Sequence, residues 1–204
     1  MRALLFAAIG FVCAAFGSTS ALAQTPSLAG ARVQQAAASV DRFKRTHAVD
    51  ALDAALRSLE AAGAQRLHGN DRANVVSGYL SLFQAIDGAM PKLPPGKMPA
   101  VTVAPPRVNG VRYPSGTEPS AIHDPAARAR YEQAIRDNEA FTERFLAAAS
   151  LRRTDDRAVT LFADFAHDAF GKGNADRMAL SRQIEHSGLT RARKDRLRSA
   201  LSVL

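Results

Sequence analysis

The sequence predicts an all-α protein, a bundle of about seven helices, because apolar residues recur every three or four positions along most of the chain. Capping and helix-stopping residues divide these stretches into separate helices. Eight of the ten prolines fall in residues 91–119, where their density excludes a helix. We therefore expect one domain, 24–204, with an N-terminal helical half (28–90), a proline-rich extended crossover and a C-terminal helical half (124–204).

The N-terminal half contains three predicted helices. The first runs over 28–47, and the second over 49–62, where Gly63 provides a common left-handed end. Asn70 or Asp71 can cap the third helix. Its wide apolar stripe needs a core to pack against. The stripe consists of Val75, Tyr79, Leu82, Phe83, Ile86 and Met90.

The sequence of the crossover is compatible with two structures. Val108 and Val111 flank an Asn109-Gly110 pair, which favours a short hairpin with a primed turn. Prolines, however, remove backbone donors from a strand ladder, and an isolated hairpin is marginally stable. The second structure is an extended, semi-rigid crossover that lies on the helices.

The C-terminal half contains about four predicted helices. Asp124-Pro125 is a strong helix start, since a capping carboxylate precedes a proline at the first helical position. This helix is expected to reach about residue 149. Thr154 or Asp155 would cap the next helix, which stops at Gly171. The last two helices are expected to start near residue 174 and after residue 190.

A pattern of residues around the predicted helix start supports the same boundary. The segment PSGTEPSAIHDP, residues 114–125, is followed by Arg130-Tyr131-Glu132, Ile135 and Asn138. The pattern resembles one found in exported bacterial helical proteins of unknown function. The resemblance covers residues 114–138 and implies a proline-rich linker followed by a long helix, with no activity attached.

Residues 1–23 have the three parts of a cleavable secretory signal. Arg2 gives a positive start, Leu4 to Phe16 form an uncharged apolar core, and Ala21-Leu22-Ala23 is the small-x-small site of a signal peptidase. The core is shorter than the ~20 residues of a membrane-spanning helix. We expect cleavage between Ala23 and Gln24, no remaining transmembrane segment, and a periplasmic or secreted protein.

Composition limits the classes of partner. Removal of the signal leaves 181 residues, and the net charge falls from +8 to +7. A basic protein in the cell envelope favours anionic surfaces. Tryptophan is absent and aromatic residues make up 6%, so we expect no stacking platform for nucleic acid. Cys13, the only cysteine, lies in the signal, which leaves the mature chain without disulfides.

Two groups of residues are candidates for chemistry or binding. Asp164, His167 and Asp168 have the i, i+3, i+4 spacing that places three metal ligands on one helical face, but such a face is usually solvated. The last predicted helix carries a basic cluster for anion contact. The cluster consists of Arg191, Arg193, Lys194, Arg196 and Arg198, with Asp195 as the one acid among them.

No residues form a recognisable catalytic or cofactor site, because the chain lacks a nucleophile elbow, a mature cysteine and a phosphate loop. The leading hypothesis is a non-enzymatic interaction module of the cell envelope or extracellular space. One alternative is a binder of polyanions or membrane surfaces through the basic C-terminal helix. The other is a metal-dependent hydrolase. We expect another protein or an anionic envelope surface as the partner, with no nucleic acid and no cofactor.

Overall fold

The computed structural model describes residues 27–108, 110–171 and 174–202. Within these ranges all regular secondary structure is helical apart from one isolated β-bridge, so the predicted all-α fold class is confirmed. The predicted signal and its cleavage site lie outside the described residues. The helices are α1 (Leu28–Thr46), α2 (Val49–Gly63), α3 (Asp71–Ala89), the 3-10 helix η1 (Pro119–Ala121), α4 (Pro125–Phe170), α5 (Asn174–His186) and α6 (Arg191–Ser202).

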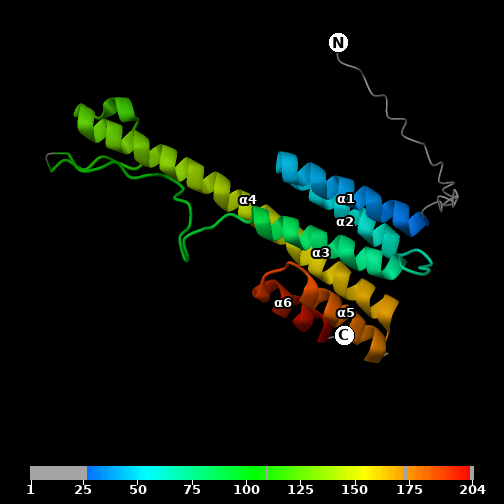
Figure 1. Cartoon of the computed structure of the whole chain (residues 1–204). Helices are drawn as coiled ribbons and strands as arrows, with labels where there is room; N and C mark the ends of the chain where they lie inside the picture. Colours follow the sequence, from blue (N-terminus) through cyan, green and yellow to red (C-terminus); the bar gives the residue numbers. More distant parts are fainter. Residues whose placement is uncertain (1–26, 109, 172–173, 203–204) are drawn as a thin grey trace, which may run out of the picture.

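Helices α1, α2 and α3 lie side by side (Figure 1). The hydroxyl of Ser27 caps α1 by accepting a hydrogen bond from the N–H of Gly30 at 2.9 Å. His47 ends α1 in a left-handed conformation with φ 54°, and α2 begins two residues later. A connection this short makes α1 and α2 antiparallel neighbours. The three predicted N-terminal helices are confirmed.

The main core joins the two halves of the chain. The ring of Phe162 on α4 packs against Tyr79 and Phe83 on α3, with centroid distances of 5.4 and 5.9 Å. Three leucines and one isoleucine from α5, α6 and the loop between them close this core, because their side chains are buried against it. They are Leu180, Ile184, Leu189 and Leu197. The C-terminal part of α4, together with α5 and α6, therefore covers α3.

The prediction of a helix break near residue 150 is wrong, and α4 runs unbroken for 46 residues. Thr154 and Asp155, the predicted caps, are buried in the helix interior. Thr154 donates a hydrogen bond to Asp53 on α2 at 3.4 Å, and Asp155 binds arginines of α6. Their polar groups are satisfied by other helices, and no glycine or proline interrupts the backbone there. The described residues thus contain six α-helices rather than about seven.

The start of α4 matches its prediction. The carboxylate of Asp124 accepts a hydrogen bond from the N–H of Ala127 at 2.9 Å, and Pro125 occupies the first turn. The helix ends at Phe170, where the N–H of Gly171 bonds the carbonyl of His167. At 1.5 Å per residue, α4 is about 70 Å long. The other helices pack on its C-terminal part, so its first half extends beyond them (Figure 1).

The crossover is extended and lies along the first half of α4. Asn138 holds it through two hydrogen bonds with the backbone of Ala100, at 2.9 Å to its N–H and 3.0 Å to its carbonyl. The predicted hairpin is reduced to a single bridge, in which Val108 and Val111 exchange both backbone hydrogen bonds. Prolines on both sides prevent the ladder from growing.

The molecule therefore has two parts, a helical body and a projecting arm (Figure 1). We define the arm as residues 91–147, the crossover together with the first half of α4. A small core of Ile122, Ala127 and Tyr131 stabilises the arm, separate from the main core, whose first residue on α4 is Leu151.

Candidate functional site

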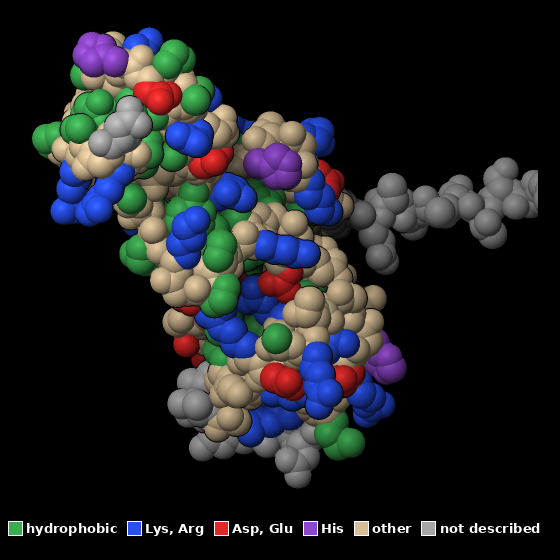
Figure 2. Space-filling model, turned by 90° about the vertical axis from the view of Figure 1, so that its left-hand side faces the viewer, with side chains coloured by type: hydrophobic (Ala, Val, Ile, Leu, Met, Phe, Trp, Pro, Cys, Tyr) green, Lys and Arg blue, Asp and Glu red, His purple; other side chains and the backbone are tan. Residues whose placement is uncertain are grey.

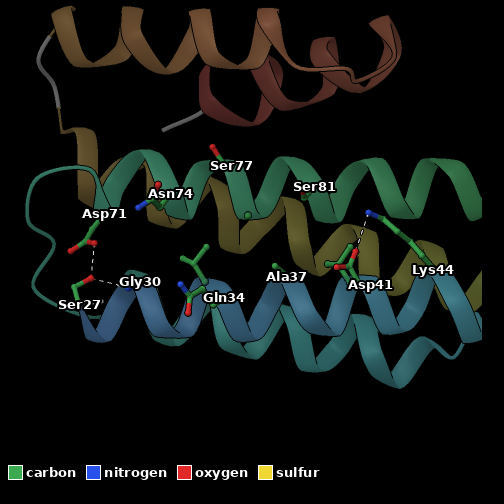
Figure 3. A pocket seen from close by; sticks show the side chains of 13 residues that line it. Ser27, Gly30, Gln34, Ala37, Asp41, Lys44, Asp71, Asn74, Ser77 and Ser81 are labelled. Atoms are coloured by element: carbon green, nitrogen blue, oxygen red, sulfur yellow. Dashed lines mark hydrogen bonds and ion pairs between the residues drawn. The ribbon is translucent and has the colours of Figure 1, made fainter. Parts of the chain in front are cut away.

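A groove of about 490 Å³ lies between α1 and α3 (Figure 3). Its middle is lined by small and hydroxyl side chains, among them Ala37 and Ser77. The charged groups lie at its ends and are already paired. Ser27 bonds Asp71 at one end, and Lys44 lies 3.4 Å from Asp41 at the other. Among the lining residues, the hydroxyl and carboxylate that a hydrogen bond brings together are those of Ser27 and Asp71.

Asp71 is a structural carboxylate in this groove. It accepts hydrogen bonds from the hydroxyl of Ser27 at 2.7 Å and from the backbone N–H of His68 at 3.1 Å. These two bonds lower the pKa of Asp71 below its ordinary value. The carboxylate therefore stays ionised near neutral pH and is a weak base. It joins the start of α1 to the start of α3.

The three candidate metal ligands line different hollows in the structure. Asp164, His167 and Asp168 are all exposed on α4. His167 lines a hollow formed by α4, α5 and α6, whereas Asp164 and Asp168 line another, formed by α2, α3 and α4. Across the described residues, no group of three or more His, Cys, Asp or Glu side chains is arranged to hold a metal ion.

The basic cluster of α6 is largely engaged in contacts within the protein. Arg193 is buried and binds Asp87 on α3 and Asp155 on α4, each at 2.5 Å. Arg196 binds Asp155 and Asp156, and Arg198 pairs with Glu185 and Asp195. The ammonium of Lys194 donates to the carbonyl of Glu185. Arg191 is exposed.

Arg193 connects α6 to the core. Burial alone would lower the pKa of its guanidinium, but the hydrogen bonds that it donates to Asp87 and Asp155, together with their negative charges, outweigh burial and raise the pKa. The guanidinium also lies 5.2 Å from the centroid of the Phe83 ring. The sequence contained a signal for this role, because Arg193 is one helical turn before Leu197 and shares its buried face.

The hollow that contains His167 has a volume of about 220 Å³ and includes Arg177 and Arg198. The guanidinium of Arg177 donates to the carbonyl of Gly171 at 3.2 Å, where α4 ends. Arg198 is paired with acids, as described above. Both cations are therefore committed to local contacts, which reduces the charge available to an anion.

The arm carries most of the exposed large apolar side chains. Six such side chains stand out on the described surface, and four of them are on the arm: Met98, Val101, Val111 and Leu146. Figure 2 looks onto the end of the arm, at the top of the view, where hydrophobic side chains lie beside lysines and arginines. Sequence analysis missed this concentration. The sequence contained a signal for Leu146. This large apolar residue directly follows Phe145, so it lies off the helical face that Tyr131, Phe141 and Phe145 share.

Comparisons do not assign a family. No protein-family model, curated protein or solved structure matches the chain. None of the described helices is both long enough and apolar enough to span a membrane. Folding of the described residues does not require a long projecting arm with exposed apolar side chains. We therefore take the arm as the candidate functional site.

Proposed function

We propose that the chain is an exported, non-enzymatic interaction module whose arm binds another protein of the cell envelope or extracellular space. The observation that carries the proposal is the concentration of exposed apolar side chains on the arm. Leu146 is 60% exposed and Val101 fully so. Burying such side chains against a partner contributes about 25 cal/mol per Å² of apolar area.

The shape of the arm supports the same proposal. Residues 125–147 of α4 extend about 35 Å beyond the main core. The crossover packs on them through the small core around Tyr131 and the Asn138–Ala100 hydrogen bonds. A helix of this length offers a surface comparable to one side of a standard protein interface. The body, by contrast, is stabilised by its own core without the arm.

Export rests on residues 1–23, which combine a positive start, an apolar core and a small-x-small site. The mass of the protein recovered from cells tests this part. A chain that begins at Gln24 is expected, and a chain that retains residues 1–23 would contradict it.

The alternative of anion binding through α6 has less support, because four of its five basic side chains contact acids or a carbonyl. The alternative of a metal-dependent hydrolase has the least support of the three, since Asp164 and Asp168 line a different hollow from His167.

Photocrosslinking in intact source cells tests the interaction. A photoreactive residue replaces Leu146 on the arm or, as a matched control, Met178 on α5, which is 59% exposed. We expect one dominant protein to be joined through position 146 and not through position 178. Equal labelling at both positions, or none at position 146, would contradict the proposal.

A further inference from the structure

A small hollow of about 170 Å³ lies where the end of α2, the middle of α3 and the last turns of α4 meet. It is separate from the arm and from the groove between α1 and α3. Its lining residues are Glu60, Gly63, Ala64, Tyr79, Leu161, Asp164, Phe165 and Asp168. The hollow thus combines carboxylates, one phenol and apolar side chains.

The hollow is acidic in a basic protein. Three carboxylates line it, from Glu60, Asp164 and Asp168. Glu60 lies 3.5 Å from Arg157, but no ion pair joins Asp164 or Asp168 to a cation among the residues that the structure describes. Like charges four apart on a helix repel each other. A cation in the hollow would relieve this repulsion.

The helix ends add to the negative potential. The last residue of α2, Gly63, lines the hollow, and Asp168 lies in the last turn of α4. The C-terminal end of a helix carries a partial negative charge, so a carboxylate there is unfavourable and a cation is favourable. Both helix ends and all three carboxylates therefore favour the same kind of ligand.

Tyr79 is a second and independent indication of a ligand. Its side chain is 1% exposed, with its ring packed against Phe83, Phe162 and Phe165. It nevertheless lines the hollow. No polar side-chain atom in the described part of the chain is sealed from solvent without a hydrogen-bond partner, so the Tyr79 hydroxyl, which bonds no described residue, opens into the hollow. Burial, followed by the charges of Glu60 and Asp164, raises the pKa of Tyr79, which keeps its hydroxyl neutral. The hydroxyl is therefore free to bond a ligand in the hollow.

Part of the lining of the hollow is apolar. Phe165 and Leu161 contribute this part, and Phe165 reaches its position because Gly63 has no side chain. A Cβ atom on Gly63 would lie 2.8 Å from Cδ2 of Phe165, closer than ordinary packing allows. A lining that combines carboxylates with apolar side chains suits an alkyl chain with a charged end better than a bare metal ion, which prefers oxygen ligands on all sides.

We propose that the Tyr79 hollow binds a primary ammonium or guanidinium group on a short alkyl chain, with Asp164 and Asp168 as counter-ions and the Tyr79 hydroxyl as hydrogen-bond acceptor. The group belongs to a small free amine or to a basic side chain of another protein. This site does not depend on the arm, so it stands or falls separately from the proposed function.

Titration of the mature protein tests the site, with the Tyr79 ring followed by NMR after isotope labelling of tyrosine. The probes are 1,4-diaminobutane for a free amine and N-acetyl-lysine methylamide for a side chain. n-Butanol is the neutral control, and Mg²⁺ and Ca²⁺ test metal binding. We expect saturable shifts of the Tyr79 resonance with the amines and none with butanol. Tighter binding of one amine than the other identifies the source of the group.

Three variants sharpen the test. The Asp164→Asn, Asp168→Asn double variant keeps the side-chain shapes and should weaken amine binding at least tenfold. Tyr79→Phe keeps the buried ring, so the core should fold. Amine binding by this variant, followed through the backbone amide resonances of Asp164 and Asp168, should be about tenfold weaker than in the parent protein, as expected for loss of one hydrogen bond to a charged group. The control is Glu139→Gln, Glu143→Gln, an exposed pair with the same spacing on the same helix. It should bind the amines like the parent protein.

Three results would overturn the proposal. One is the absence of a saturable shift with either amine. Another is amine binding that the Asp164→Asn, Asp168→Asn variant retains. The third is tight binding of Mg²⁺ or Ca²⁺ that displaces the amines, because the hollow would then be a metal site.

Discussion

The guanidinium of Arg193 on α6 lies 2.5 Å from the carboxylate of Asp155 on α4, and the two side chains are 6% and 4% exposed. Asp87 on α3 contacts the same guanidinium. Three helices that are distant in sequence therefore meet at one buried cation. The ion pairs replace the helix cap that Asp155 was predicted to form, and they fix where the last helix packs.

Replacement of Arg193 by Met should lower the free energy of unfolding by about 3 kcal/mol, because Asp155 and Asp87 would be left without their buried partner. Urea unfolding followed by circular dichroism measures the change. Arg191→Met on the exposed side of the same helix is the control and should change stability by less than about 0.5 kcal/mol. An equally small effect at Arg193 would show that the buried pair is unimportant for stability.

The attachment of the crossover to the arm should depend on Asn138. Its side-chain amide both donates to and accepts from the backbone of Ala100. Asn138→Leu removes both bonds at similar side-chain size. Hydrogen exchange at the Ala100 amide should become about fivefold faster, since one net hydrogen bond is worth about 1 kcal/mol. The neighbouring variant Glu139→Gln should leave this exchange rate unchanged. Unchanged exchange in Asn138→Leu would mean that other contacts hold the crossover.

Asp71 should make the stability depend on acid pH. Its pKa is lowered in the folded protein, so its contribution is complete above about pH 4, the ordinary value, and is lost as pH falls through the folded pKa. Ser27→Ala removes one of the two hydrogen bonds and should raise the pKa of Asp71, which NMR titration of its carboxyl carbon measures. It also removes the cap of α1, a loss that does not vary with pH.

The difference in unfolding free energy between the parent and Ser27→Ala should therefore be larger at pH 7 than at pH 3. A difference that is the same at both values would show that the Ser27–Asp71 hydrogen bond does not favour the ionised form.

Two glycines of α3 should respond in opposite ways to replacement by Ala. A Cβ on Gly88 meets nothing within 4 Å, so Gly88→Ala should stabilise the protein by about 0.5 kcal/mol through helix propensity. A Cβ on Gly78 would lie 2.5 Å from Cδ2 of Leu59, which is fully buried on α2. Gly78→Ala should destabilise by about 1 kcal/mol or more, because the buried leucine must move. Thermal unfolding compares the two, and a gain at both positions would contradict the packing of α3 on α2.

The sequence predicted the helices where local signals agree. Asp124-Pro125 and Gly171 mark the two ends of α4, and both signals act within one helical turn. The last helix was predicted to start after residue 190, and the hydroxyl of Thr190 caps it by accepting a hydrogen bond from the N–H of Arg193 at 3.3 Å. Such signals need no knowledge of the tertiary fold.

Prediction from the sequence failed where contacts between residues far apart in the chain determine the structure. Asp155 resembles a cap in sequence, and only its contacts with α6, some 40 residues later, show that it belongs inside a helix. The shared face of Asp164, His167 and Asp168 was a correct local inference, yet the neighbouring helices place them around different hollows. The hollow around Tyr79 could not be predicted, because its carboxylates come from two helices whose packing the sequence does not state.

Cysteine labelling in cells tests the central claim most directly, since Cys13 is the only natural cysteine. Leu146→Cys on the arm and Met178→Cys on the body, each with Cys13→Ala, are treated with a maleimide in intact source cells and as purified proteins. If the arm binds a partner, position 146 should be labelled much more slowly in cells than in the purified protein, whereas position 178 should show no such difference. Equal labelling of position 146 in both settings would contradict the claim that the arm is a binding surface.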